Sequence, residues 1–113
     1  MITANEYQNM AMRTLPEHLK DPDNNLCAIL HGLMGLSGES GEAIDIFKKH
    51  LFQGHDFDVK HLAEELGDVA WYLAATAHAI GYDLETIFNM NIEKLKKRYP
   101  KGFNSSNSVN RND

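Results

Sequence analysis

Apolar residues recur at intervals of three and four positions along most of the chain, which is the period of an α-helix with one buried face. The two clearest runs are Leu26, Ile29, Leu30, Leu33 and Met34, and Val59, Leu62, Leu66, Val69, Leu73 and Ala77. No segment shows the strict apolar–polar alternation that is typical of a half-buried strand. The pattern therefore predicts an all-α protein.

Capping residues and helix breakers divide this pattern into four predicted helices. We expect them to run from Ile2 or Ala4 to about Thr14, from Asp23 or Asn24 to about His50, from Asp58 to Gly81, and from Asp83 to Pro100. Residues 52–57 form the turn between the second and third helices, so these two should pair as an antiparallel hairpin. Residues 1–103 make one domain, and the polar residues 104–113 are expected to be a disordered tail.

Four glycines at three-residue spacing lie in the predicted second helix: Gly32, Gly35, Gly38 and Gly41. Each costs the helix about 1 kcal/mol relative to alanine. We favour close packing against another helix as the reason for this strip. Room for a ligand beside Glu39 is a second interpretation, and the two are compatible.

Two pairs of acidic residues, Glu39 with Glu42 and Glu65 with Asp68, lie on the two helices of the hairpin. Residues three positions apart share a helix face. The pairs are symmetric about the middle of the turn, so Glu39 should face Asp68 and Glu42 should face Glu65. Four carboxylates at one height repel each other unless a cation lies between them, and oxygen ligands favour Mg²⁺ or Mn²⁺. Spacing alone leaves a metal site and an ordinary solvated helix face both open.

The composition narrows the classes of partner. The chain of 113 residues carries 11 basic and 16 acidic residues, a net charge of −5, which argues against non-specific binding to nucleic acid or to an anionic membrane. An anionic substrate would therefore need cations or a local basic cluster. With a single cysteine, Cys27, and no signal-peptide pattern, we expect a cytoplasmic protein. So short a chain would gain stability from oligomerisation.

Several residues near the acids are candidates for substrate contacts. Lys49 returns to the carboxylate face seven residues after Glu42, either as a solvated surface lysine or as a phosphate contact. Tyr72 lies four residues after Asp68, so its hydroxyl could reach the site. A row on one side of the fourth helix is either a solvated face or a phosphate-binding surface: Asn91, Lys94 and Arg98.

Other site chemistries lack their motifs. None of the four acids is followed three residues later by a histidine, as the di-iron carboxylate bundles require. No Gly-x-x-x-x-Gly-Lys loop is present, so a Walker-type nucleotide site is not predicted. His61 lies four residues before Glu65 and is interpreted as a surface histidine.

Three blocks of sequence resemble the MazG-like family of all-α nucleoside triphosphate pyrophosphatases. They are Gly-Glu-Ser-Gly-Glu-Ala at 38–43, Glu-Glu-Leu-Gly-Asp-Val-Ala-Trp-Tyr-Leu at 64–73, and Asn-Ile-Glu-Lys-Leu-Lys-Lys-Arg-Tyr-Pro-Lys-Gly-Phe at 91–103. The family pattern is Glu-x-x-Glu, a spacer, and Glu-x-x-Asp, and the resemblance covers roughly residues 26–103. It is specific to the family but not to a substrate.

The resemblance implies a four-helix MazG-like bundle that assembles as a homodimer or homotetramer. It implies hydrolysis of nucleoside or deoxynucleoside triphosphates to monophosphate and pyrophosphate, as in the housecleaning of nucleotide pools. The implied metal ligands for Mg²⁺ are Glu39, Glu42, Glu65 and Asp68, with Glu39 or Glu42 as general base. The implied phosphate contacts are Asn91, Lys94 and Arg98, with Tyr72 as a substrate neighbour. Removal of residues 104–113 is expected to change neither assembly nor rate.

Two alternatives stay open at this point. One is an activity like that of phosphoribosyl-ATP pyrophosphohydrolase, although the third block is more similar to MazG. The other is a non-catalytic helical oligomer that uses the acids as a structural metal site. The N-terminal helix and the turn at 51–57 are where we expect base selectivity, and they carry no motif that identifies the base.

Overall fold

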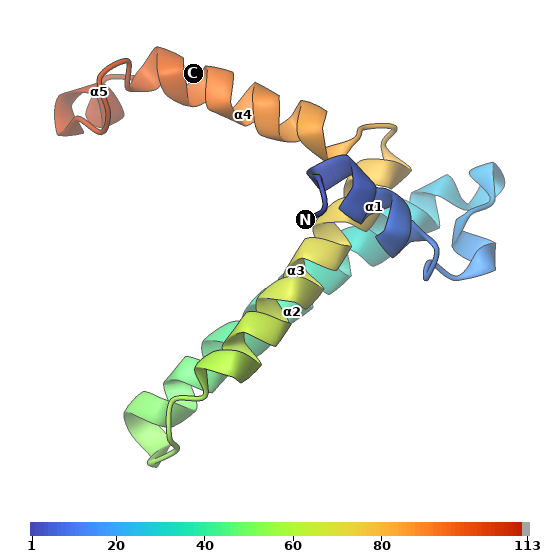
Figure 1. The fold of residues 1–113 in the computed structure, drawn as a ribbon, viewed down its shortest axis with the longest axis horizontal. Coiled ribbons are helices and arrows are strands. Elements are labelled where there is room, and N and C mark those ends of the chain that lie inside the picture. Colours follow the sequence, from blue (N-terminus) through green and yellow to red (C-terminus); the bar gives the residue numbers. More distant parts are fainter. Residues whose placement is uncertain (112–113) are drawn as a thin grey trace.

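The computed structural model describes residues 1–111, and helices make up most of this part of the chain (Figure 1). The four long helices are α1 (Ala4–Met12), α2 (Asn25–Gln53), α3 (Val59–Ala79) and α4 (Leu84–Arg98). Two short 3₁₀ turns, η1 (Glu17–Leu19) and η2 (Pro22–Asn24), connect α1 to α2, and a short helix α5 (Ser105–Val109) follows α4. No strand occurs among the described residues, so the predicted all-α class is confirmed.

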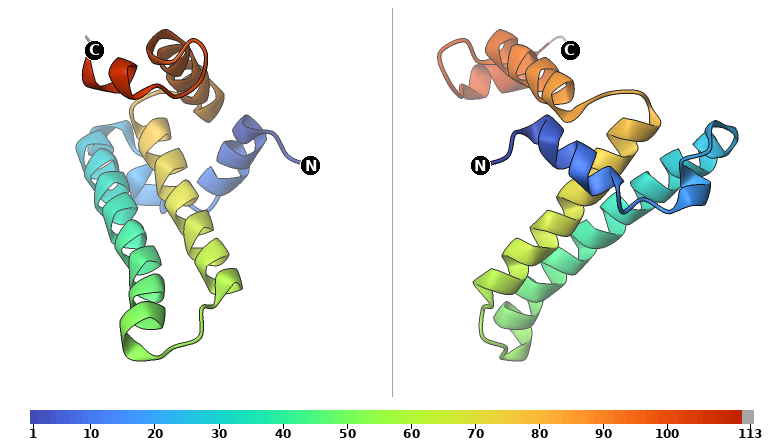
Figure 2. Two further views of the ribbon diagram at one scale, coloured as in Figure 1. Left: turned by 90° about the vertical axis from the view of Figure 1, so that its left-hand side faces the viewer. Right: turned by 45° about the vertical axis from the view of Figure 1, so that its right-hand side comes forward.

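Helices α2 and α3 form the antiparallel hairpin that the sequence predicts (Figures 1 and 2). Helix α2 ends at Gly54, whose φ of 74° gives the left-handed backbone conformation that glycine adopts without strain. Helix α3 begins after Asp58, whose carboxylate accepts a hydrogen bond of 3.0 Å from the backbone N–H of His61. These two caps fix where the chain reverses and therefore which residues of α2 and α3 lie at the same height.

The glycine strip of α2 has two different surroundings. A Cβ atom on Gly32 would overlap the side chain of Thr76, and a Cβ atom on Gly35 would overlap the ring of Tyr72. No atom lies within 4 Å of the corresponding position at Gly38 or Gly41. Close helix packing therefore explains the first two glycines, whereas the last two border open space beside the acidic residues.

This difference predicts opposite effects of two alanine substitutions. Gly35→Ala is expected to destabilise the fold by about 1–3 kcal/mol, because Tyr72 is itself packed and must move. Gly38→Ala is expected to stabilise the metal-free protein by up to about 1 kcal/mol, because alanine is the better helix former and nothing obstructs it. Urea unfolding of the two variants measures both effects. Equal loss of stability in both would contradict the packing described here.

Helix α1 crosses the hairpin and is attached to it through a buried amide. Gln8 is only 5% exposed, and its Nε2 donates to the backbone oxygens of Ala74 (3.2 Å) and Tyr82 (3.1 Å). Its Oε1 accepts from the backbone N–H of Leu84 at 3.0 Å. One side chain thus joins α1, the end of α3 and the start of α4. The sequence pattern did not mark Gln8 as a core residue.

Helix α4 leads away from the hairpin, so the four long helices do not close into a compact bundle within one chain (Figures 1 and 2). The radius of gyration is 17.3 Å, compared with about 13 Å for a compact domain of this length. Large apolar side chains of α2 remain in solvent, among them Leu26 (80% exposed) and Met34 (65% exposed). The single chain therefore leaves much of its apolar surface uncovered.

The C-terminal segment differs from the disordered tail that the sequence predicts. Ser105–Val109 form α5, and Asn104 caps it by accepting a hydrogen bond of 3.1 Å from the backbone N–H of Asn107. Polar composition indicates little apolar burial, but it does not exclude a locally capped helical turn. Residues 112 and 113 lie outside the described part of the chain.

Candidate functional site

The acidic residues of the hairpin come together across α2 and α3. One carboxylate oxygen from each of Glu39, Glu42 and Glu65 lies within 4.8 Å of those of the other two. Glu39 and Glu42 belong to α2 and Glu65 belongs to α3. The structure therefore joins three of the four predicted acids into one group, which we call the acidic cluster. Asp68, one turn after Glu65, lies outside this group but is close enough for its charge to act on Glu39.

The pKa of Glu39 is raised above its usual value. Partial burial is the main cause, followed by the neighbouring carboxyl group of Glu65 and then by the negative charges of Asp68, Glu42 and Glu65. Each of these causes disfavours the charged form of Glu39. The protein's own basic groups therefore do not offset the negative charge of the acidic cluster.

Glu39→Gln is expected to stabilise the metal-free protein at neutral pH. Because the pKa of Glu39 is higher in the folded state, the folded chain binds more protons than the unfolded chain just above pH 4.5, the ordinary value for this group. The resulting penalty is absent below that pH and is fully present above the raised pKa. The wild-type protein should thus lose stability relative to Glu39→Gln as the pH rises through this window. Urea unfolding of both proteins in chelator between pH 4 and 8 tests this, and a constant difference would contradict it.

Glu65 provides an independent indication that the cluster suits a cation. Its side chain is 14% exposed, and its Oε1 lies 3.4 Å from Nε2 of His61. Its Oε2 is buried and has no hydrogen-bond partner among the described residues. A buried carboxylate oxygen without a donor is costly, and a hard divalent cation with oxygen ligands would satisfy it. His61, interpreted from the sequence as a surface residue, is exposed but contacts Glu65.

An aromatic group borders the acidic cluster on the side towards the start of α2. Tyr72 lies over Gly35, one turn from Glu39, and its ring centroid is 5.5 Å from that of His31 and 5.0 Å from that of Trp71. Nδ1 of His31 is buried without a partner among the described residues. The sequence pattern did not mark His31, although this residue lies eight positions before Glu39 and hence on the same helix face.

Trp71 of α3 and Tyr7 of α1 connect the surroundings of the acidic cluster to α1. Nε1 of Trp71 donates to Oγ1 of Thr14 at 2.8 Å, which makes Trp71 a structural contact between α3 and the end of α1. Burial, and then the charge of Asp68, raise the pKa of Tyr7. Asp68 therefore acts on α1 as well as on the acidic cluster.

The predicted basic contacts are not beside the acids within one chain. Nζ of Lys49 pairs with Asp45 at 3.1 Å, and the two lysines Lys48 and Lys49 hold the pKa of Asp45 below its usual value. The row of Asn91, Lys94 and Arg98 lies on α4, which leaves the hairpin at the end of α3. Since Glu65 and Ala79 are about 21 Å apart along α3, one chain does not bring this row to the acidic cluster (Figure 1).

No helix in the described part of the chain combines the length and apolar character needed to cross a membrane.

Comparison with known proteins matches one family to the part of the chain that contains both acid pairs and the row of Asn91, Lys94 and Arg98 on α4. The sequence model of the MazG nucleotide pyrophosphohydrolase domain matches residues 30–103. Gene 37 protein of Mycobacterium phage L5 is 34% identical over 93 residues, which cover 75% of this chain and 82% of the phage protein. No solved structure gave a significant match. The family match spans most of the chain, and the chain therefore belongs to the MazG nucleotide pyrophosphohydrolase family.

Proposed function

We propose that this protein hydrolyses nucleoside or deoxynucleoside triphosphates to the monophosphate and pyrophosphate, with Mg²⁺ or Mn²⁺ held by the acids of the hairpin. The observation that carries the proposal is the acidic cluster of Glu39, Glu42 and Glu65, which lies inside the region matched to the family. Asp68 completes the proposed ligand set.

The donors of the cluster fit a hard divalent cation. All are carboxylate oxygens, and one of them is buried without a hydrogen-bond donor. Burial, and then the neighbouring carboxyl groups, raise the pKa of Glu39 and so disfavour its charged form. A cation bound there would offset the negative charge of the triphosphate and acidify the attacking water. The family is one of nucleotide pyrophosphohydrolases, whose nucleotide substrates are anions. The acidic cluster would repel such a substrate unless a bound cation reduced the negative charge.

The general base in this proposal is one of the two acids of α2, Glu39 or Glu42. The water oxygen forms a new bond to the α-phosphorus, and the bond from that phosphorus to the bridging oxygen breaks. Pyrophosphate leaves with the electron pair of the broken bond, and a carboxylate takes the proton of the water.

The remaining substrate contacts require a second copy of the chain in this proposal. Asn91, Lys94 and Arg98 would contact the phosphates, but α4 diverges from the hairpin of its own chain (Figure 1). The exposed apolar residues of α2 support assembly, because a homodimer or homotetramer would cover them. Tyr72 packs against Gly35, which lies one turn before Glu39 on α2, and would neighbour the substrate. Lys49 is left out of the contact set, because Asp45 already pairs with it.

We propose that the biological role of this reaction is the removal of unwanted nucleotides from the cytoplasmic pool. The preferred base would be set by residues around Tyr72 and His31 and by the N-terminal helix, where no sequence motif identifies it.

The proposal is tested by incubating the purified protein with Mg²⁺ and a panel of canonical and modified NTPs and dNTPs. The nucleotide products are separated and pyrophosphate is quantified. We expect equimolar monophosphate and pyrophosphate from a subset of the panel. Diphosphate with orthophosphate would overturn the proposal. If the folded, metal-bound protein turns over none of the panel, phosphoribosyl-ATP is the next substrate to test, and failure there favours the non-catalytic oligomer.

A further inference from the structure

His31 is a polar member of the aromatic group beside the acidic cluster, and it has no hydrogen-bond partner within residues 1–111. Its imidazole lies between the two helices of the hairpin. The ring centroid is 5.5 Å from that of Tyr72 and 6.1 Å from that of Trp71, and both of these residues belong to α3. Nδ1 is buried, although the residue as a whole is only half-buried. A buried polar atom without a partner is uncommon and costs stability, so it needs an explanation.

The neighbouring polar groups are engaged elsewhere. Nε1 of Trp71 donates to Oγ1 of Thr14 at 2.8 Å, and the backbone oxygen of Tyr72 accepts from Oγ1 of Thr76 at 2.8 Å. A leucine at position 31 would fill similar space without an unpaired nitrogen, so packing alone does not favour an imidazole there. The other ring nitrogen, Nε2, is not buried in this way and is therefore the atom that a ligand can reach.

The position of His31 relative to the acidic cluster matches the length of a nucleotide. His31 precedes Glu39 by eight residues of α2, a rise of about 12 Å along the helix axis. Both side chains are directed towards α3, because His31 packs against Tyr72 and Glu39 interacts with Glu65. A nucleotide whose α-phosphate lies at the acidic cluster carries its base at the far end of the ribose. This offset along α2 therefore suits the base.

The surroundings of His31 also suit a base better than a phosphate. The ring of Tyr72 lies over Gly35, midway between His31 and Glu39 on α2. Aromatic side chains offer flat faces on which bases stack, whereas they offer no charge to an anion. A ligand that extends from the acidic cluster towards His31 would thus pass along an aromatic surface and end at an unpaired ring nitrogen.

We propose that Nε2 of His31 forms a hydrogen bond to the edge of the nucleobase when the triphosphate is bound at the acidic cluster, which makes His31 a specificity-determining residue. The inference rests on the proposed function and extends it to the nucleoside end of the substrate. A neutral imidazole offers one donor and one acceptor, so it distinguishes bases by the polar atoms on their edges. A site that forms a hydrogen bond to its substrate rejects analogues that lack the matching group.

The test measures kcat/KM for nucleoside triphosphates that differ only in the base, using wild type, His31→Leu and His31→Gln. His31→Leu should reduce the ratio of kcat/KM between the best and the poorest base by about tenfold or more. Inhibition by inorganic tripolyphosphate, which has no base, should stay unchanged. His31→Gln should recover part of the ratio, because its amide places polar atoms close to the position of Nε2.

Two controls separate a base contact from a packing role. His78→Leu makes the same replacement at an exposed histidine of α3, and it should keep the wild-type ratio. Urea unfolding of the metal-free proteins should show that His31→Leu is no less stable than wild type, because the change removes an unpaired buried nitrogen and retains similar volume.

An unchanged ratio in His31→Leu would overturn the inference. So would an equal loss for every base together with weaker tripolyphosphate inhibition, because the imidazole would then support the whole site. Calorimetric binding of non-hydrolysable α,β-methylene triphosphates separates this inference from the proposed function. Base-dependent binding that His31→Leu removes, without turnover of any natural triphosphate, would retain the base contact and reject the hydrolytic activity. Turnover with unchanged selectivity in His31→Leu would do the reverse.

Discussion

Replacing Glu42 or Asp68 with alanine is expected to lower kcat/KM by at least about 100-fold, because each change removes a proposed ligand of the catalytic cation. Both residues are exposed, so neither substitution removes a packed side chain. Circular dichroism and light scattering should therefore report wild-type helix content and mass. The measurement is steady-state kinetics on the best triphosphate.

The matched control is Glu64→Ala, which removes the same charge from an exposed residue of α3 that lies outside the acidic cluster. It should retain wild-type kinetics. If Glu42→Ala and Asp68→Ala lose their fold along with their activity, the acids have a structural role. If both keep full activity, the acidic cluster is not the catalytic site.

Removal of divalent cations is expected to abolish turnover, and an excess of Mg²⁺ over the chelator should restore it. Without a cation, the cluster repels both itself and the triphosphate. The same addition of Mg²⁺ should raise the free energy of unfolding, by about 2.7 kcal/mol at a concentration one hundred times the Kd. This gain should be much smaller in Glu42→Ala, which lacks one of the ligands.

Activity assays and thermal unfolding, each with EDTA and then with Mg²⁺ or Mn²⁺, measure these effects. Turnover that persists undiminished in excess chelator would reject the metal-dependent mechanism. Stabilisation of wild type and Glu42→Ala to the same extent would place the cation elsewhere on the protein.

The hairpin and its acids were predictable because they depend on local signals. Helical periodicity identified α2 and α3, and a capping aspartate and a turn glycine fixed the reversal between them. Those two positions determine which residues lie at the same height. The acid pairs of α2 and α3 therefore lie opposite each other across the hairpin. Glu39 was expected to face Asp68, and it contacts Glu65 while the charge of Asp68 also raises its pKa.

The direction of α4 and the buried hydrogen bonds of Gln8 were not predictable in the same way. Periodicity tells which face of a helix is apolar, but not the angle at which it leaves its neighbour. The junction of α1, α3 and α4 is held by three hydrogen bonds of one amide side chain to backbone groups distant in sequence. A glutamine on a predicted helix carries no sign of such partners.

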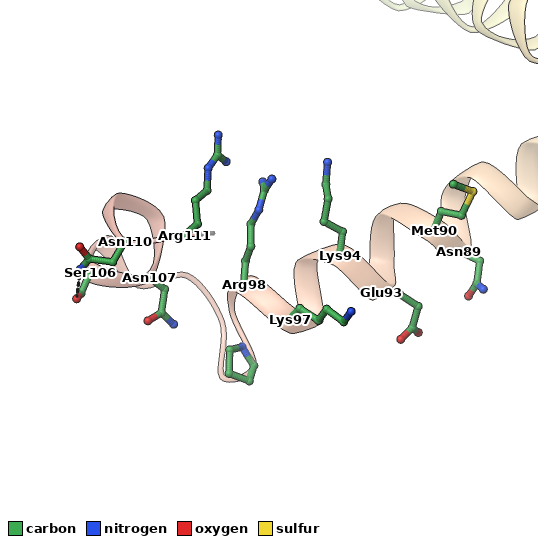
Figure 3. A pocket seen from close by; sticks show the side chains of 11 residues that line it. Asn89, Met90, Glu93, Lys94, Lys97, Arg98, Ser106, Asn107, Asn110 and Arg111 are labelled. Carbon is green, nitrogen blue, oxygen red and sulfur yellow. Dashed lines mark hydrogen bonds between the residues drawn. The ribbon is translucent and has the colours of Figure 1, made fainter. Parts of the chain in front are cut away.

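The C-terminal helix was missed for a different reason. A run of Asn and Ser residues indicates a segment without an apolar core, and this is correct for residues 104–111. Asn104 nevertheless starts a short helix, because its Oδ1 accepts a hydrogen bond from the backbone N–H of Asn107. The side-by-side arrangement of Lys94, Arg98 and Arg111 in Figure 3 then depends on how the chain folds back after α4.

The most direct test of the central claim is hydrolysis of the best triphosphate in ¹⁸O-labelled water with Mg²⁺, followed by mass analysis of both products. Attack at the α-phosphorus predicts one labelled oxygen in the nucleoside monophosphate and none in the pyrophosphate. Label in pyrophosphate would show attack at the β-phosphorus, and label in orthophosphate would show loss of the terminal phosphate. Either result would contradict the reaction that we assign to the acidic cluster.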